Sequence, residues 1–266
     1  MREDISLQGR AALITGSVGG LGAEVARTLA GAGVQVMLTG LDAADVIEPL
    51  CREIAGATGA QVGYTRADLA SLDEIAGLVA RTRESLGRID ILVNSAVVRH
   101  FAPIEAFPAD RWSEALAVNL SAPFHLTRMV LPAMRAAGYG RIFNFTSVYG
   151  SRGTQNRVDY VATKSGIEGL TRATAMECTD GAVTCHALCP GSVLTPSLKV
   201  RIKALAEQEH LGWDEAVATF LKGKQPSGCF VEERSVAEVL LMLCGRVGPD
   251  MNGAIVPIEG GWLARA

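Results

Sequence analysis

Residues 15–22 read Thr-Gly-Ser-Val-Gly-Gly-Leu-Gly and join two segments of different periodicity. The apolar run Ala11–Thr15 before them has the length of a strand, and Leu21–Ala30 after them has the 3.6-residue period of a helix. Glycines in such a connection let the backbone turn tightly and approach a ligand, and the unpaired N–H groups of the helix start attract an anion. The stretch therefore predicts a phosphate-binding turn between strand and helix. A tight turn without a ligand is the alternative.

The same alternation of strand-like and helix-like segments continues along the chain. Apolar runs of this kind suit strands that are buried on both faces, as in a parallel sheet. Between them lie helical segments such as Ile75–Leu86, which Ser71 and Glu74 would open as a capping box. We therefore predict an α/β fold, a doubly wound parallel sheet of the Rossmann type with about seven strands. The further strand-like runs are Val34–Thr39, Gln61–Thr65, Ile89–Asn94, Arg141–Thr146, Val183–Leu188 and Ala254–Ile258.

No linker or internal repeat divides the chain, so we predict a single domain over residues 1–266. Its dinucleotide-binding part spans about residues 1–150, and its catalytic and substrate part spans about residues 140–266. Only Leu198–Phe230 interrupts the alternation, as a polar helical insertion. An insertion this late in a doubly wound fold predicts a substrate lid near residues 198–230.

Composition excludes several functions. The 25 Lys and Arg against 28 Asp and Glu give a net charge of −3, which leaves no basic excess for binding nucleic acid. No apolar stretch is long enough to span a membrane, and the charged start Met1–Asp4 predicts no secretion signal. The six cysteines form no Cys-x-x-Cys pair. Cys185 and Cys189 are spaced like a metal pair, but we interpret them as core, predict no metal site, and place the protein in the cytoplasm.

Four polar residues have a spacing that favours chemistry on a hydroxyl group. Tyr160 and Lys164 lie one turn apart on a predicted helix. A phenol titrates near pH 10, so it becomes a base near neutral pH only when a cation stabilises the phenolate. Ser147 follows the strand Arg141–Thr146, and Asn119 lies in a helix expected near the carboxyl edge of the sheet.

With these motifs the chain resembles the short-chain dehydrogenase/reductase family over essentially its whole length. One departure is residues 94–97, which read Asn-Ser-Ala-Val where the family usually has Asn-Asn-Ala-Gly, so that Val97 is expected near the cofactor ribose. The resemblance implies that the cofactor is bound by Gly16, Ser17, Gly20, Leu21, Gly22, Asp68, Leu69, Asn94, Ala96, Tyr160, Lys164, Pro190, Gly191, Val193 and Thr195.

The resemblance also implies a role for each of the four polar residues. Tyr160 is the general acid/base, and Ser147 holds the substrate oxygen. Lys164 lowers the pKa of Tyr160 and binds the ribose hydroxyls, while Asn119 orders a water in the proton relay. The expected reaction is hydride transfer between a secondary alcohol and a nicotinamide. A hydrolase is disfavoured because the chain has no Gly-x-Ser-x-Gly motif, and a non-catalytic NAD-binding sensor would not need the four residues together.

The end of the second predicted strand distinguishes the two nicotinamide cofactors. An acidic residue there binds the ribose 2′-hydroxyl of NAD, whereas an arginine accepts the 2′-phosphate of NADP. Residues 39–42 read Thr-Gly-Leu-Asp, and no Lys or Arg lies between Arg27 and Arg52 or in the glycine turn. This pattern predicts NAD.

Within the family, the chain resembles the bacterial D-3-hydroxybutyrate dehydrogenases, which hold a small carboxylate with two Gln, a His and a Lys. The corresponding residues here are Arg99 and Arg201 for Gln, Tyr149 for His and Arg157 for Lys, and Ser192 replaces a bulky Trp. The predicted substrate-binding residues are Arg99, Ser147, Tyr149, Arg157, Tyr160, Ser192 and Arg201.

Three arginines in one pocket favour an anionic hydroxy acid that is larger or more anionic than 3-hydroxybutyrate. The alternatives are 3-hydroxybutyrate itself, a polyol or sugar substrate, and arginines that face solvent or pair with Asp159. The family resemblance further implies a homotetramer, with the helix after Tyr160 and the segment Gly253–Trp262 at its interfaces.

Overall fold

The computed structural model describes residues 5–265, apart from the side chain of Ser197, and its centre is a parallel sheet. The strands follow the order β3-β2-β1-β4-β5-β6-β7, and every neighbouring pair is parallel. The predicted doubly wound α/β fold is therefore confirmed. The strand bounds are β1 Ala11–Thr15, β2 Gln35–Gly40, β3 Val62–Arg66, β4 Ile91–Asn94, β5 Gly140–Phe145, β6 Val183–Pro190 and β7 Ile255–Ile258.

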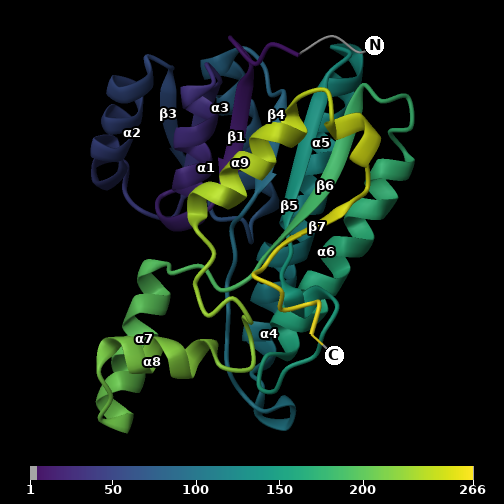
Figure 1. Ribbon diagram of the computed structural model, residues 1–266. Helices are drawn as coiled ribbons and strands as arrows, with labels where there is room; N and C mark the ends of the chain where they lie inside the picture. The colour runs from purple at the N-terminus through teal and green to yellow at the C-terminus, as the bar shows by residue number, and fades with distance from the viewer. Residues whose placement is uncertain (1–4, 266) are drawn as a thin grey trace.

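Helices cover both faces of the sheet, as Figure 1 shows. One face carries α1 (Gly20–Gly31), α2 (Ala44–Thr58) and α9 (Glu233–Cys244), whose apolar side chains share a buried cluster with the strands. The other face carries α3 (Leu72–Leu86) and α5 (Ala122–Ala136), together with α4 (Ala109–Leu116) and α6 (Val158–Met176). The strands are apolar on both sides because they pack against helices on both sides.

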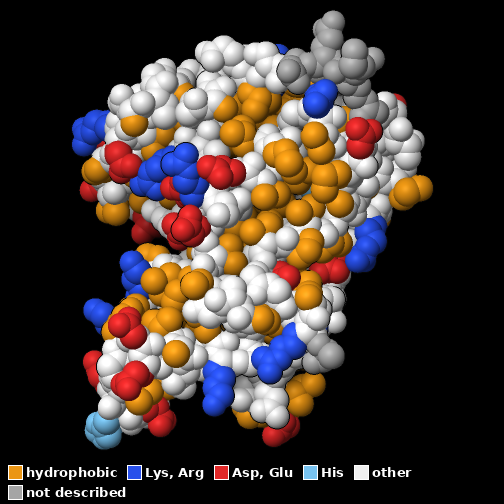
Figure 2. All heavy atoms as spheres, viewed as in Figure 1, with side chains coloured by type: hydrophobic (Ala, Val, Ile, Leu, Met, Phe, Trp, Pro, Cys, Tyr) orange, Lys and Arg blue, Asp and Glu red, His pale blue; other side chains and the backbone are white. Residues whose placement is uncertain are grey.

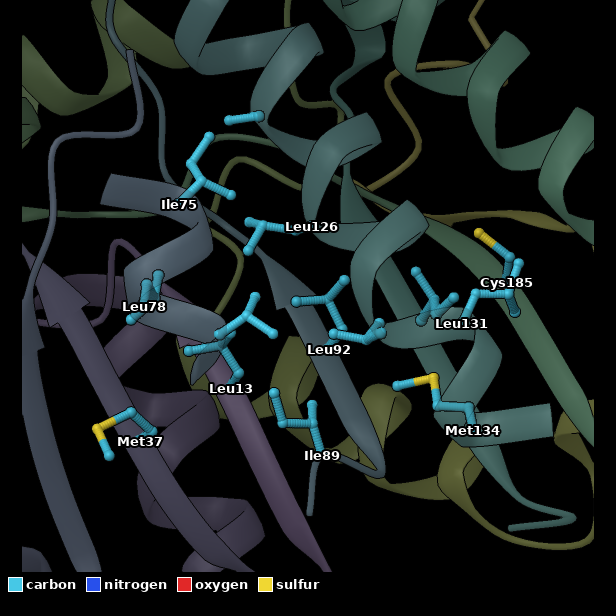
Figure 3. Close-up of a cluster of buried hydrophobic side chains, with 14 of the residues drawn as sticks. Leu13, Met37, Ile75, Leu78, Ile89, Leu92, Leu126, Leu131, Met134 and Cys185 are labelled. Atoms are coloured by element: carbon cyan, nitrogen blue, oxygen red, sulfur yellow. The ribbon is translucent and has the colours of Figure 1, made fainter. Parts of the chain in front are cut away.

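The core beneath α3 and α5 is drawn in Figure 3. Leu13 of β1 and Leu92 of β4 point from the sheet toward Leu78 of α3 and Leu126 of α5, and all four side chains are fully buried. Burying a leucine contributes roughly 2 kcal/mol to folding. This packing holds α3 and α5 against the sheet and leaves its carboxyl edge to the loops.

The start of α3 differs from the capping box expected there. The Ser71 hydroxyl accepts a hydrogen bond from the Glu74 N–H at 3.3 Å, as predicted. The Glu74 carboxylate, however, accepts from the N–H of Asp68 at 2.7 Å instead of from the cap residue. The strand-to-helix connection after β3 is therefore tied to the helix by the side chain of Glu74.

The predicted lid is a pair of helices, α7 (Pro196–Glu209) and α8 (Trp213–Leu221). They pack on each other around the buried Leu198, Ile202 and Ala216, which form a small cluster of their own. Figure 1 shows the pair standing away from the sheet, and Figure 2 shows a recess between it and the body of the molecule. Among the helices of the described part of the chain, none is both long and apolar enough for a membrane span.

Candidate active site

A cleft of about 700 Å³ opens at the carboxyl edge of the sheet, between the sheet and α7. The glycine turn after β1, the ends of β5 and β6, the start of α6 and the lid contribute its walls. The cleft is therefore lined by both predicted parts of the chain, the dinucleotide-binding part and the catalytic part. In an open parallel sheet this edge is where ligands bind.

The start of α1 has the properties of an anion site. Its N-cap residue, Gly19, has no side chain that could cap the first N–H groups, and the first turn of the helix contains no acidic residue. Gly16 has φ +62°, and a Cβ there would lie 2.6 Å from the Cα of Ala96. Gly16, Gly20, Leu21 and Gly22 all line the cleft. Free N–H groups and a backbone without side chains fit the pyrophosphate of a dinucleotide.

The side chain of Ser17, in the same turn, is buried and does not line the cleft. Its fully buried hydroxyl donates to the carbonyl of Ile14 at 2.7 Å and accepts from the N–H of Thr39 at 3.0 Å, while its own N–H donates to the carbonyl of Thr39. These bonds join the glycine turn to β2 and leave the hydroxyl group no free donor. Ser17 therefore shapes the turn from inside.

Four other residues expected at the cofactor also lie outside the cleft lining. Asn94 is buried, and its amide donates to the side chain of Asn144 at 2.8 Å. Ala96 and Leu69 pack on the core beneath α3 and α5. The carboxylate of Asp68 accepts from the N–H of Ala70 at 2.9 Å. By contrast Pro190, Gly191, Val193 and Thr195 line the cleft.

The end of β2 contains two features that the linear sequence hides. Gly40 stands at the end of β2, where an acidic residue would bind the ribose of NAD. A Cβ on Gly40 would lie only 2.6 Å from Cγ1 of Val18, so the side chain of Val18 leaves no room for a larger residue there. Arg66, at the end of neighbouring β3, donates from Nε to the carbonyl of Leu41 at 3.0 Å. A cation therefore does lie beside the end of β2, contrary to the expectation that none would be near.

Tyr160, Lys164 and Ser147 meet in the cleft, as predicted. Ser147 follows β5, while Tyr160 and Lys164 occupy successive turns of α6, and all three side chains are buried. Burial by itself raises the pKa of Tyr160, but Arg99, Lys164, a hydrogen bond with Ser147 and Arg157 outweigh it and lower that pKa below the ordinary value. The arrangement favours a phenolate nearer neutral pH.

Lys164 is held in place by the end of β5, because its Nζ donates to the carbonyl of Phe145 at 2.6 Å. Burial is the main cause that lowers the pKa of Lys164, and Arg99 and Arg157 act in the same direction, against Tyr160. The ammonium is thus close enough to Tyr160 to interact with it while its position is determined by the backbone.

Asn119 lies in η2 (Ala117–Ser121), a π-helical turn between α4 and α5. Its Oδ1 accepts from the N–H of Val98 at 2.8 Å, and its Nδ2 donates to the carbonyl of Val98 at 3.0 Å. The side chain is 1% exposed and does not line the cleft. Asn119 therefore clamps the segment that precedes Arg99.

The three predicted arginines all line the cleft, together with Tyr149 and Ser192. Arg157 is half-buried, its Nε has no hydrogen-bond partner, and burial lowers its pKa. Arg99 and Arg201 remain exposed to solvent at the cleft. The carboxylate of Asp159 accepts from the N–H of His100 at 3.2 Å and forms no ion pair with any of the three within residues 5–265.

Several cleft residues were missed by the sequence analysis, including Phe101, Phe220, Lys224 and Trp262. Phe101 comes from the loop after β4, Phe220 and Lys224 from α8 and the residues after it, and Trp262 from the turn after β7. For Phe220 and Lys224 the lid prediction was a signal, since an insertion that covers the site must contribute side chains to it. Periodicity alone cannot tell which of those side chains face inward.

The chain is similar in sequence to known proteins of one family. Residues 10–205 match the family profile described as short chain dehydrogenase. The chain is 38% identical over 260 residues to D-beta-hydroxybutyrate dehydrogenase of Cupriavidus necator, covering 97% of this chain and 100% of that protein. It is 33% identical over 264 residues to D-threitol dehydrogenase of Mycolicibacterium smegmatis, covering 98% and 96% of the two chains.

Solved structures resemble the chain over nearly its full length. L-Sorbose reductase from Gluconobacter frateurii, solved with NADPH and L-sorbose, superposes with a TM-score of 0.93 at 24% identity and covers 98% of this chain and 100% of that one. At this identity the likeness shows the fold. Levodione reductase has a TM-score of 0.87 at 30% identity and covers 97% and 99% of the two chains.

Proposed function

This chain belongs to the short chain dehydrogenase family and is an oxidoreductase acting on an alcohol or ketone, and we propose that it uses NAD and an anionic hydroxy acid larger or more anionic than 3-hydroxybutyrate. The observation that carries the proposal is the environment of Tyr160. A buried phenol is surrounded by Lys164 and two arginines, which favours both a phenolate and a bound anion.

The proposed roles of the residues follow from their positions. In oxidation the substrate loses a hydride from the carbinol carbon and a proton from its hydroxyl group, so that the C–O bond becomes a carbonyl. Tyr160 takes the proton as a phenolate, Ser147 donates a hydrogen bond to the substrate oxygen, and Lys164 stabilises the phenolate charge. A nicotinamide dinucleotide, when bound, supplies the hydride acceptor. Asn119 supports the segment beside this site, and its water-ordering role stays a prediction.

NAD is proposed as the cofactor because the glycine turn contains no cation that would hold a 2′-phosphate, and Asp42 follows the end of β2. Arg66 is the feature that favours NADP instead, because its guanidinium lies beside Leu41. Initial rates with each cofactor at several concentrations decide between them. A larger kcat/KM with NADP would contradict the proposal.

The anionic substrate is supported by three arginines that line the cleft without carboxylate partners among the described residues. Oxidation of 3-hydroxybutyrate itself remains the second candidate, because a relative with that name is 38% identical over nearly the whole chain. A screen of reduced cofactor production tests both candidates. It should include 3-hydroxybutyrate, longer hydroxy acids, sulfonates, sugar acids and uncharged polyols. Faster turnover of polyols, or efficient turnover of 3-hydroxybutyrate, would contradict the preferred substrate class.

A homotetramer in the cytoplasm completes the proposal. In the helix expected at an interface, Met176 is 74% exposed, which an interface would explain, but Ile167 is buried within the subunit. In the C-terminal segment expected at an interface, Trp262 lines the cleft instead. The six cysteines form no disulfide within the described residues, which suits a reducing compartment. Light scattering on the purified protein measures the oligomeric state, and a monomeric mass would refute the tetramer.

A further inference from the structure

Cations lie beside aromatic rings through the cleft, from Tyr160 to the lid. The guanidinium carbon of Arg157 lies 4.1 Å from the ring centroid of Tyr160 and 4.9 Å from that of Phe101. The same atom of Arg201 lies 5.1 Å from the centroid of Phe101, on the way to the lid. Arg157 and Arg201 thus both adjoin the ring of Phe101.

The row continues on the lid. Arg201 of α7 lies 5.9 Å from the ring centroid of Phe220, and Nζ of Lys224 lies 3.6 Å from the same centroid. Lys224 is half-buried, and burial together with Arg201 and Arg157 lowers its pKa. Phe220 therefore adjoins both Arg201 and Lys224, as Phe101 adjoins both Arg157 and Arg201.

The four cations form two pairs that belong to different parts of the fold. The inner pair, Arg99 and Arg157, adjoins Tyr160 and lies on the body of the molecule. The outer pair, Arg201 and Lys224, lies on and just after the lid helices. Neither pair takes part in any of the ion pairs among the described residues.

We propose that the outer pair is a second anion site and that the substrate is a hydroxy dicarboxylic acid. One carboxylate binds Arg99 and Arg157 beside the reacting carbon, and the other binds Arg201 and Lys224. This inference rests on the proposed function and narrows its substrate class. Arginine and lysine without partners, in a cleft lined by aromatic rings, bind carboxylates more strongly than the same groups do in water.

The second carboxylate also connects the lid to the body. α7 and α8 pack on each other, so their position over the cleft depends on few contacts with the sheet. An anion shared between the two pairs of cations would offset their mutual repulsion and draw the lid toward Tyr160. A substrate with one carboxylate leaves the outer pair uncompensated.

The test uses two substrates of equal chain length, 3-hydroxyadipate and 3-hydroxyhexanoate, which differ in having a carboxylate or a methyl group at the far end. For the unaltered protein kcat/KM should be at least about tenfold higher for the dicarboxylate, the effect of about one charge-assisted hydrogen bond. The double variant Arg201→Gln/Lys224→Gln should lose most of this preference. Equal values for the two substrates, or a preference that survives the double substitution, would overturn the second site.

A matched control removes two charges from the same elements outside the cleft. Lys203 on α7 and Lys222 after α8 are exposed and do not line the cleft, so Lys203→Gln/Lys222→Gln should keep the dicarboxylate preference. Loss of the preference in this control would mean that net charge alone produces it. The affinity for NADH should be the same in all three proteins. If the affinity for NADH were weaker only in the Arg201→Gln/Lys224→Gln variant, the outer pair would bind the cofactor and not the substrate, and the inference would be overturned.

A binding measurement separates failure of this inference from failure of the proposed function. Adipate, which has two carboxylates and no hydroxyl group to oxidise, should raise the Tm of the NADH-loaded protein more than hexanoate does. The Arg201→Gln/Lys224→Gln variant should lose this difference. If no hydroxy acid of the substrate screen is oxidised, the proposed function fails, while the adipate result still decides on the second site. Equal effects of adipate and hexanoate would contradict it.

Discussion

The guanidinium of Arg157 lies over the ring of Tyr160, with 4.1 Å between its Cζ and the ring centroid. Arg99 approaches the same ring at 5.2 Å, so two arginines adjoin the phenol on which the reaction depends. These cations stabilise the phenolate and, at the same time, attract an anionic substrate. A change at either arginine should therefore alter proton transfer as well as binding.

Substitution of Arg99 should shift the pH dependence of the reaction. Among the cations that lower the pKa of Tyr160, Arg99 is the strongest, so Arg99→Gln should raise that pKa. Oxidation requires the phenolate, and the rise in kcat/KM with pH should then occur at higher pH. A pH profile measures this shift. Arg128→Gln, at an exposed arginine of α5 outside the cleft, is the control, and an unshifted profile in Arg99→Gln would contradict the prediction.

Removal of the phenol hydroxyl should slow catalysis strongly and leave cofactor binding. General acid–base groups contribute about 10²- to 10⁴-fold, so Tyr160→Phe should lower kcat by roughly that factor. The cofactor affinity, measured by NADH fluorescence, should change little because the glycine turn is untouched. Full activity of Tyr160→Phe would show that another residue transfers the proton.

The cofactor prediction is tested at Arg66. We expect kcat/KM with NAD to exceed that with NADP by at least about tenfold, since no cation of the glycine turn pairs with a 2′-phosphate. Arg66→Gln should reduce any remaining activity with NADP and leave the NAD reaction unchanged, because a 2′-hydroxyl carries no charge. A loss with both cofactors would indicate that Arg66 acts by holding the loop through Leu41.

Acid should destabilise the protein through His186. Burial, aided by Arg141, lowers the pKa of His186 from 6.5 to about 4, and its ring stacks on Phe143 with 5.6 Å between centroids. Between these pH values the unfolded chain takes up a proton that the folded chain excludes. The free energy of unfolding should therefore fall as pH drops from 6.5 to 4, by up to about 3 kcal/mol.

Urea unfolding at pH 7 and at pH 4.5 measures this loss. His186→Gln has no group that titrates in this range, so its stability should depend less on pH. The exposed His210, which has φ +54°, provides a control as His210→Asn, since asparagine tolerates that conformation. An unchanged pH dependence in His186→Gln would assign the acid sensitivity to other groups.

The sequence alone was sufficient for the fold, and it identified side chains that the structure brings together in the cleft. Largely hydrophobic runs such as Ala11–Thr15 and Val183–Leu188 identified strands because burial on both faces favours apolar residues along the whole strand. The glycines after β1, the four-residue spacing of Tyr160 and Lys164, and the place of Ser147 just after a predicted strand are all local properties of the sequence. Arg99, Arg157 and Arg201 were also placed correctly in the cleft.

Only the tertiary structure decided which side chains face the cleft and which support it from behind. The Ser17 hydroxyl bonds to the backbone of Ile14 and Thr39, the Asn94 amide donates to the side chain of Asn144, and neither side chain lines the cleft. Arg66 and Lys224 are far in sequence from the sites they adjoin. They come near those sites through strand pairing and lid packing, and these long-range contacts depend on the folded chain as a whole.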